Sequence, residues 1–271
     1  MFKTRLISGI VLVAVAIVLM VMGNEVLLTA MLAISLIGMF ELYRVLKIEK
    51  SLMAIVSYLA AIIYYCSLEW HFIPDIWILL MLYIIVLMFV YVLNYPKYEA
   101  YQLFGSFFGF FYVGVMLSYI YQIRMLERGA YLVWLVFLCS WGCDTCAYCV
   151  GKLWGKAFGN HKMSPKLSPN KSIEGAIGGV AGAFLLTALY AVIFKKQMGI
   201  SSQEILILAV ISAIGGLISM IGDLTASAIK RNYDIKDYGK LIPGHGGILD
   251  RFDSMIITAP IIFYLAFYFL G

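Results

Sequence analysis

Long apolar stretches separated by short polar loops run along the whole chain. Most of these stretches contain about 18 residues or more, which is enough for one helix to cross roughly 30 Å of hydrocarbon. The apolar windows predict about nine membrane-spanning helices, near residues 5–22, 26–43, 52–68, 74–94, 103–122, 130–150, 174–194, 204–228 and 253–270. The pattern therefore predicts an all-α, polytopic integral membrane protein in a lipid bilayer.

The composition supports this prediction. Of the 271 residues, 63% are hydrophobic and 13% are charged, whereas soluble domains average nearer one half and one quarter. The first apolar stretch, Leu6 to Met22, is too long for the core of a secretion signal and lacks a small-residue cleavage pattern. We therefore expect this stretch to be retained as the first span.

The basic loops predict the orientation, because lysine and arginine accumulate on the cytoplasmic side of membrane proteins. The loops that alternate as this rule requires lie at residues 3–5, 44–50, 97, 151–172 and 229–251. The amino terminus is predicted to be cytoplasmic and the carboxyl terminus to lie outside. The net charge of +5 is modest and concentrated in a few loops, which argues against nucleic acid as a partner.

The two halves of the chain differ in character. The first hundred residues have almost no ionisable group inside a predicted span, apart from Glu41 near a cytoplasmic end. From Trp141 onward, carboxylates enter the apolar helices and the loops are rich in Gly, Pro, Lys, Asn and His. We predict an amino-terminal transmembrane scaffold over residues 1–125 and a catalytic transmembrane region over residues 126–271, with two cytoplasmic substrate loops.

Two aspartates, Asp144 and Asp223, fall inside predicted spans. A carboxylate in hydrocarbon is costly and normally faces a cavity, a partner or an ion, so each marks a candidate functional site. Around Asp223, the positions of Ser219, Ser227 and Lys230 place all four side chains on one helix face. We expect that face to avoid lipid. The alternative is an Asp223–Lys230 pair that only joins two helices.

The segment 227–253 combines cations with a glycine-rich run. The residues that suit a phosphate ligand are Ser227, Lys230, Arg231, Lys236, Lys240, His245, Gly246 and Gly247. Glycine lets backbone N–H groups approach phosphate oxygens, and the cations neutralise phosphate charge. The segment is therefore predicted to bind phosphate groups.

Asp250 and Asp253 follow this run, three residues apart where the last helix should begin, with Arg251 between them. Both carboxylates can point to one side of that helix. Asp250 alone has the alternative of a helix N-cap. Carboxylate oxygens that leave room for water and substrate phosphates suit Mg²⁺. We predict Mg²⁺ as a cofactor, with Asp144, Asp223, Asp250 and Asp253 as candidate ligands.

The other polar loop, 151–172, ends just before the seventh predicted span. A helix amino terminus preceded by Ser and Lys binds anions through its free N–H groups. We predict substrate binding by Ser168, Asn170, Lys171 and Ser172. The alternative is a basic loop that orients the protein and contacts anionic lipid headgroups, which is a reasonable role for Lys152, Lys156 and Lys162.

Four of the five cysteines, Cys139, Cys143, Cys146 and Cys149, lie in one apolar segment. Their spacing is compatible with a metal or iron–sulfur site. A thiol is also a small, nearly apolar group suited to close helix packing, and no distant Cys or His group completes a coordination set. We therefore predict packing, with neither a cluster nor a disulfide.

The order of these residues resembles the signature of the phosphatidate cytidylyltransferase family. The matching downstream residues are Ser227, Lys230, Arg231, Lys236, Asp237, Pro243, His245, Gly246, Gly247, Asp250, Arg251 and Asp253. The matching upstream residues are Trp141, Asp144, Ala147, Tyr148, Gly151, Ser168, Pro169, Asn170, Lys171, Ser172, Glu174, Gly175, Gly178 and Gly179. Many family members have Thr at the position of Ser172, which keeps the hydroxyl. The earlier spans match only in hydropathy.

The resemblance implies Mg²⁺-dependent transfer of a cytidylyl group from CTP to phosphatidic acid, giving CDP-diacylglycerol and pyrophosphate for phospholipid synthesis. The implied location is the plasma membrane, with the active site facing the cytoplasm. Catalytic roles are expected for Asp223, Lys230, Asp250 and Arg251, and substrate-binding roles for Ser168, Asn170, Lys171, Ser172, Ser227, Arg231, His245, Gly246 and Gly247. A homodimer is compatible with these features, although none requires it.

Two other functions would also place aspartates inside membrane helices. A CDP-alcohol phosphotransferase also clusters aspartates in membrane helices, but its two closing acids are four residues apart, whereas Asp250 and Asp253 are three apart. An ion or lipid transporter would use Asp144 and Asp223 as a cation path. Such transporters often contain inverted repeats, and no internal repeat is visible in this sequence.

Overall fold

The computed structural model describes residues 2–159 and 161–270 and is almost entirely helical. Within this described part, eight helices are long and apolar enough to span a membrane: Asn24–Val45, Leu52–Trp70, Ile76–Leu93, Ala100–Arg124, Gly129–Gly155, Ile173–Ile193, Ser202–Asn232 and Leu249–Leu270. Each overlaps a predicted span, and the remaining predicted span overlaps helix α1 (Phe2–Met22). The all-α, polytopic prediction is confirmed. The count of nine and the cytoplasmic amino terminus stay predictions.

The chain divides into two compact units. The first contains Met1–Tyr121 and Asp237–Arg251, and the second contains Gln122–Lys236 and Phe252–Gly271. The segment Asp237–Arg251, which carries several predicted substrate residues, therefore packs with the amino-terminal spans. The proposed separation of scaffold from catalytic region at residue 125 concerns function and stays a prediction.

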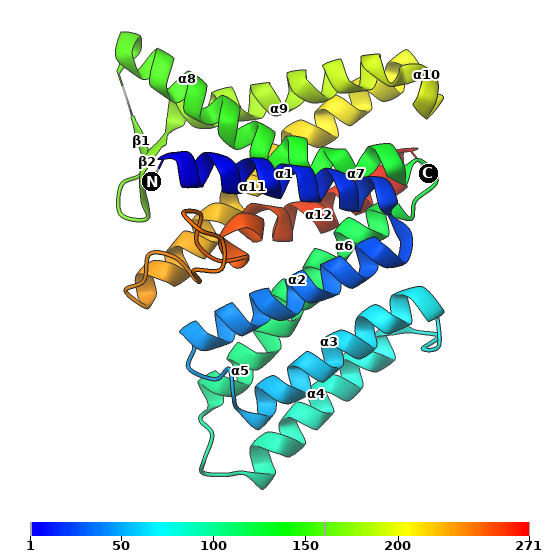
Figure 1. The fold of residues 1–271 in the computed structure, drawn as a ribbon, viewed down its shortest axis with the longest axis vertical. Helices are drawn as coiled ribbons and strands as arrows, with labels where there is room; N and C mark the ends of the chain where they lie inside the picture. Colours follow the sequence, from blue (N-terminus) through cyan, green and yellow to red (C-terminus); the bar gives the residue numbers. More distant parts are fainter. Residues whose placement is uncertain (1, 160, 271) are drawn as a thin grey trace. The chain divides into compact units, whose positions relative to one another are not determined.

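The first unit is built on successive spans. Its elements are α1, α2 (Asn24–Val45), α3 (Leu52–Trp70), α4 (Ile76–Leu93), α5 (Ala100–Gly109), the π-helical segment η1 (Phe110–Val115) and most of α6 (Met116–Arg124). Helices α3 and α4 run side by side (Figure 1). Tyr43 and Tyr83, both buried, donate hydrogen bonds to the Ser106 carbonyl at 2.6 and 3.1 Å. These bonds satisfy polar groups where water is excluded and join α2, α4 and α5.

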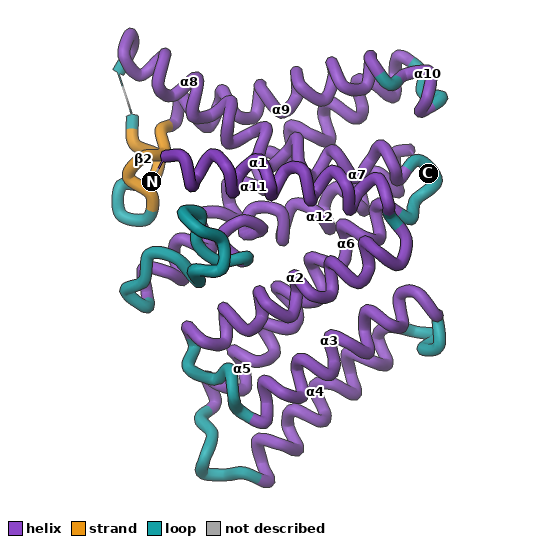
Figure 2. Tube along the Cα trace, viewed as in Figure 1, coloured by secondary structure: helices purple, strands orange, loops and turns teal. Residues whose placement is uncertain are grey.

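The second unit continues with shorter connections. Its elements are α7 (Gly129–Phe137), the π-helical segment η2 (Leu138–Gly142), α8 (Cys143–Phe158), β1 (Lys162–Ser164), β2 (Ser168–Ser172), α9 (Ile173–Ile193), α10 (Lys195–Met198), α11 (Ser202–Asn232) and most of α12 (Leu249–Leu270). Strands β1 and β2 pair antiparallel, with Lys162 opposite Ser172 and Ser164 opposite Ser168. Figure 2 shows this hairpin leading directly into α9. The sequence had indicated only a basic loop there.

Glycines bring α8 and α9 close together (Figure 1). An added Cβ at Gly179 would lie 2.9 Å from the Cys143 Sγ atom and 3.0 Å from the Cys143 carbonyl oxygen, and one at Gly182 would overlap Cys146. Cys139 similarly faces Gly215 of α11. Small residues permit such close contact between membrane helices. The prediction that these thiols serve helix packing agrees with their positions.

A Gly179→Val substitution tests this contact. The added side chain has to displace the backbone of α8, so we expect a loss of about 1–3 kcal/mol of stability and a lower unfolding temperature in detergent. Leu189→Val introduces the same side chain at an exposed position of α9 and is expected to melt within about one degree of the wild type. Equal melting temperatures for both variants would contradict the packing argument.

Candidate active site

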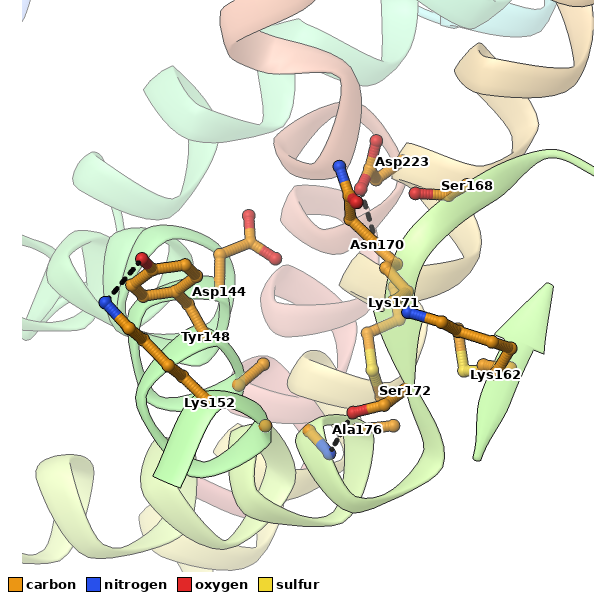
Figure 3. A pocket seen from close by; sticks show the side chains of 15 residues that line it. Asp144, Tyr148, Lys152, Lys162, Ser168, Asn170, Lys171, Ser172, Ala176 and Asp223 are labelled. Atoms are coloured by element: carbon orange, nitrogen blue, oxygen red, sulfur yellow. Dashed lines mark hydrogen bonds and ion pairs between the residues drawn. The ribbon is translucent and has the colours of Figure 1, made fainter. Parts of the chain in front are cut away.

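A polar pocket of about 550 Å³ lies within the second unit, inside the usual size range of about 300–1,000 Å³ for ligand pockets. Its walls come from α8, the β1–β2 hairpin, the start of α9 and the middle of α11 (Figure 3). The lining residues are Asp144, Ala147, Tyr148, Gly151, Lys152, Lys162, Met163, Ser168, Asn170, Lys171, Ser172, Gly175, Ala176, Met220 and Asp223. The pocket thus joins the two intramembrane aspartates to the predicted substrate loop.

An ion pair crosses this pocket from strand β2 to helix α11. The Nζ atom of Lys171 lies 2.5 Å from the Oδ2 atom of Asp223, and the two side chains are 21% and 27% exposed. A charge that is shielded from water requires a partner of opposite sign. Asp223 therefore finds its partner more than fifty residues away in the sequence, a contact that helix periodicity does not predict.

Asp144 reaches the same pocket from α8. Its carboxylate and the side chains of Asn170 and Asp223 border one space in Figure 3. The π-helical segment η2 ends two residues before Asp144. Such a segment shifts the register of side chains around the helix and often occurs beside functional sites. Asp144 thus lines a cavity, one of the environments expected for an intramembrane carboxylate, and its functional role stays a prediction.

Two further lysines line the pocket. Lys152 donates a hydrogen bond to the Tyr148 hydroxyl at 3.4 Å, and its Nζ atom lies 5.6 Å from the centre of the Tyr148 ring (Figure 3). Lys162 extends from β1. Both were expected to contact lipid headgroups, but their position gives the pocket three amino groups with Lys171. The combination of cations and carboxylates suits a ligand with several phosphates and a metal ion.

The predicted polar face of α11 is shielded. Ser219 is completely buried, Asp223 and Ser227 are half-buried, and Lys230 is only 9% exposed. The Ser227 hydroxyl donates a long hydrogen bond of 3.5 Å to the Asp223 Oδ1 atom. This shielding agrees with the expectation that the face avoids lipid, which stays a prediction.

Ser172 begins helix α9 as its N-cap. Its Oγ atom accepts a hydrogen bond of 3.1 Å from the Gly175 N–H. An added Cβ at Gly151 would lie 3.1 Å from that oxygen, so the close approach of α8 encloses the cap. Ser172 therefore organises the helix terminus that borders the pocket, and its proposed contact with substrate remains a prediction.

The glycine-rich segment belongs to the first unit. Its glycines were expected to bind phosphate, but in the structure three of them lie against carboxylates of the protein. Added Cβ atoms at Gly239 and Gly247 would overlap the Glu41 carboxylate, and one at Gly246 would lie 2.8 Å from the Asp250 Oδ2 atom. Gly246 also has φ +90°, which glycine adopts readily. The protein's own carboxylates therefore account for the glycines at these three positions, and phosphate binding by Gly246 and Gly247 stays a prediction.

Asp250 lies inside α12, which begins at Leu249. Its Oδ2 atom accepts hydrogen bonds from the backbone N–H groups of Tyr238 at 2.8 Å and Gly247 at 3.0 Å. Both donors precede the helix, so Asp250 fixes the preceding loop. The alternative of a simple N-cap for α12 is wrong.

Asp253 belongs to the second unit and is 8% exposed. Its Oδ1 atom accepts the Ser254 N–H at 2.8 Å. Its carbonyl oxygen lies 2.8 Å from the position of an added Cβ at Gly222. The start of α12 thus approaches α11 directly beside Asp223.

The predicted site residues therefore fall into three groups. Six line the pocket: Asp144, Ser168, Asn170, Lys171, Ser172 and Asp223. Four others of the second unit, Ser227, Lys230, Arg231 and Asp253, lie outside its lining among the described residues. Five belong to the first unit: His245, Gly246, Gly247, Asp250 and Arg251. Glu41, a residue given no role from the sequence, lies against Gly247 of this last group and accepts the backbone N–H groups of the neighbouring Ile248 and Leu249.

These features define a polytopic helical membrane protein with a charged ligand pocket among its spans. The sequence profile of the Cytidylyltransferase family matches residues 3–269, and the chain belongs to this family. Proteins named phosphatidate cytidylyltransferase are similar over nearly their whole length. The one from Bacillus subtilis (strain 168) is 30% identical over 270 residues, which cover 97% of each chain. The one from Staphylococcus aureus (strain COL) is 32% identical over 267 residues, which cover 96% of this chain and 97% of the relative.

The Ser172 cap can be tested by two substitutions. Ser172→Ala removes the acceptor for the Gly175 N–H, so we expect a loss of about 1 kcal/mol and a lower unfolding temperature. Ser172→Thr keeps the oxygen and is expected to retain wild-type stability. If thermal unfolding in detergent shows the same temperature for the Ala and Thr variants, Ser172 does not act as a cap.

Proposed function

We propose that this protein transfers a cytidylyl group from CTP to phosphatidic acid, giving CDP-diacylglycerol and pyrophosphate for phospholipid synthesis. The observation that carries the proposal is the pocket bordered by Asp144, Lys171 and Asp223 among membrane-spanning helices. Membership of the Cytidylyltransferase family and similarity to proteins named phosphatidate cytidylyltransferase support the choice of reaction. The protein would lie in the plasma membrane with its active site facing the cytoplasm, because CTP is available there.

The pocket offers positive charge where the triphosphate would bind. Lys152, Lys162 and Lys171 border it, and ammonium groups form strong hydrogen bonds with phosphate oxygens. Asn170 and Ser168 supply uncharged polar groups on the same strand. When the substrate phosphates bind, Lys171 could exchange part of its interaction with Asp223 for a phosphate oxygen, because both partners are anionic.

The carboxylates fit Mg²⁺. No group of three or more His, Cys, Asp or Glu side chains in the described part of the chain is arranged to hold a metal ion. Mg²⁺ usually takes one or two carboxylates together with water and substrate phosphates. We propose that Asp144 and Asp223 hold Mg²⁺ with the triphosphate, and retain Asp250 and Asp253 as candidate ligands. The bound ion would neutralise charge on the reacting phosphates.

The reaction needs positioning more than proton transfer. A phosphate oxygen of phosphatidic acid, already anionic, attacks the α-phosphorus of CTP. A new P–O bond forms, the bond between the α-phosphorus and the bridging oxygen breaks, and pyrophosphate leaves with that electron pair. Lysine and arginine side chains, among them Lys230, Arg231 and Arg251, would stabilise the negative charge on the transferring group. Ser227 and His245 would donate hydrogen bonds to phosphate oxygens.

An apolar groove beside the pocket suits the acyl chains. It has a volume of about 690 Å³ between α9 and α11 and shares three lining residues, Met163, Ala176 and Met220, with the polar pocket. Its remaining lining includes Ile177, Phe184 and Leu217, among other apolar side chains. Phosphatidic acid could thus place its headgroup among the lysines while its acyl chains stay in an apolar environment.

Pyrophosphate release by purified protein in detergent tests the proposal. We expect release only when CTP, phosphatidic acid and Mg²⁺ are all present, and its loss on chelation of the metal. Asp144→Asn and Asp223→Asn remove negative charge at the site and are expected to lower kcat/KM by about a hundredfold or more. Circular dichroism would establish that both variants remain folded.

Asp234→Asn is the matched control for this assay. Asp234 is exposed in the turn after α11 and has φ +52°, a conformation that Asn tolerates. We expect wild-type activity from this variant. Full activity in the Asp144 and Asp223 variants, or pyrophosphate release without phosphatidic acid, would refute the proposed site or reaction.

A further inference from the structure

Glu41 of α2 is the buried carboxylate that the proposed reaction leaves without a role. It is 4% exposed, and its two oxygens accept backbone hydrogen bonds from consecutive residues. Oε1 accepts the Ile248 N–H at 3.1 Å, and Oε2 accepts the Leu249 N–H at 2.8 Å. Leu249 is the first residue of α12 and Ile248 directly precedes it, at a helix end where donors lack intrahelical partners. Glu41 therefore binds the end of the segment Asp237–Arg251 from more than two hundred residues away.

The fit between Glu41 and this segment is close on several sides. Gly239 and Gly247 both lie against the carboxylate, where any larger side chain would overlap it. Glu41 thus contacts the beginning and the end of the segment at once. A negative charge near a helix amino terminus is also favourable for the helix dipole.

Arg44, one turn further along α2, holds the same segment at a second point. Its Nη2 atom donates a hydrogen bond of 2.6 Å to the Tyr238 carbonyl oxygen. The N–H of Tyr238 donates to Asp250, so the peptide groups on both sides of Tyr238 are fixed. Tyr238 itself is only 1% exposed.

Ser8 of α1 holds the tip of the segment. Its Oγ atom lies within hydrogen-bond distance of the Pro243 carbonyl oxygen, at 3.0 Å, and of the Thr4 carbonyl oxygen of its own helix, at 2.9 Å, and forms a hydrogen bond of 2.8 Å with the Nδ1 atom of His245. An added Cβ at the adjacent Gly9 would lie 3.7 Å from the His245 ring, an ordinary contact distance. The first two spans therefore contact the tip and both ends of one segment.

We propose that Glu41 and Arg44 are positioning residues, assisted by Ser8, which hold Asp237–Arg251 in the conformation that acts on substrate. This inference rests on the proposed function, because that function gives His245, Asp250 and Arg251 their roles. If Glu41 and Arg44 have this role, the amino-terminal spans contribute to catalysis indirectly, by holding the segment Asp237–Arg251. Glu41 acts through the backbone, since its oxygens bind N–H groups of the protein.

The experiment combines kinetics with limited trypsin digestion of Glu41→Gln in detergent. The amide can accept one of the two N–H groups but faces the other with a donor, which leaves a buried donor without a partner. We expect cleavage after Lys240, an exposed residue of the segment, to accelerate roughly tenfold, and kcat/KM for CTP to fall by a similar factor. Cleavage after Lys97, exposed in the α4–α5 loop of the same unit, is expected to stay at the wild-type rate.

Two further variants make this result specific. Arg44→Ala removes an exposed side chain, so the protein is expected to fold, and should accelerate cleavage after Lys240 without affecting Lys97. Glu25→Gln changes an exposed carboxylate in the first turn of α2 and should match the wild type throughout. Both variants would be compared with Glu41→Gln at the same protease concentration.

The outcomes separate the two hypotheses. Wild-type cleavage and kcat/KM in both Glu41→Gln and Arg44→Ala would overturn the positioning role. Parallel acceleration at Lys97 and Lys240 would also overturn it, because the effect would then be general destabilisation. An absence of CDP-diacylglycerol synthesis by the wild type would instead refute the proposed function, while the cleavage pattern would still report whether Glu41 holds the segment.

Discussion

The ion pair between Lys171 and Asp223 allows two charges to persist among membrane-spanning helices. Either charge alone would lose hydration without compensation in this environment. The pair joins β2 to α11, and its position depends on α8, α9 and α11 packing closely enough to enclose a pocket. Glycines at the α8–α9 contact make that approach possible. The ion pair therefore depends on the helix packing. A wider separation of the helices would expose Lys171 and Asp223 to solvent and enlarge the cavity around them.

Polar groups are also paired in the first unit, where carboxylates accept hydrogen bonds from backbone N–H groups. Asp250 and Glu41 together accept four N–H groups from Tyr238, Gly247, Ile248 and Leu249. An irregular loop beside apolar helices would otherwise leave these donors unsatisfied. In the sequence these glycines suggest a phosphate-binding loop. In the structure their lack of a side chain leaves room for the carboxylates of Glu41 and Asp250. A phosphate ligand of this segment is thus expected to depend mainly on side-chain cations and on backbone groups other than these four.

Hydropathy was sufficient to predict most of the spans, because the thickness of hydrocarbon sets the length of an apolar helix. Hydropathy predicts that the last span begins at residue 253, whereas α12 begins at Leu249, because the first turn of the helix contains Asp250 and Arg251. The cost of burying a carboxylate marked Asp144 and Asp223 as candidate functional residues, and both line the pocket. The Lys171–Asp223 pair and the Glu41 contacts could not be predicted, since they depend on how distant segments pack. The short β1–β2 hairpin also lacked an alternating apolar pattern that would have revealed it.

In the proposed reaction, a charged pocket among membrane helices joins a water-soluble nucleotide to a lipid. The most direct measurement follows two radiolabels from CTP in a reaction with phosphatidic acid and Mg²⁺, one at the α-phosphate and one at the γ-phosphate. Cytidylyl transfer predicts that the α-label enters the organic phase as CDP-diacylglycerol and that the γ-label stays in water as pyrophosphate. If the γ-label appears in the lipid, or if neither label does under conditions where the protein is folded, the account is contradicted.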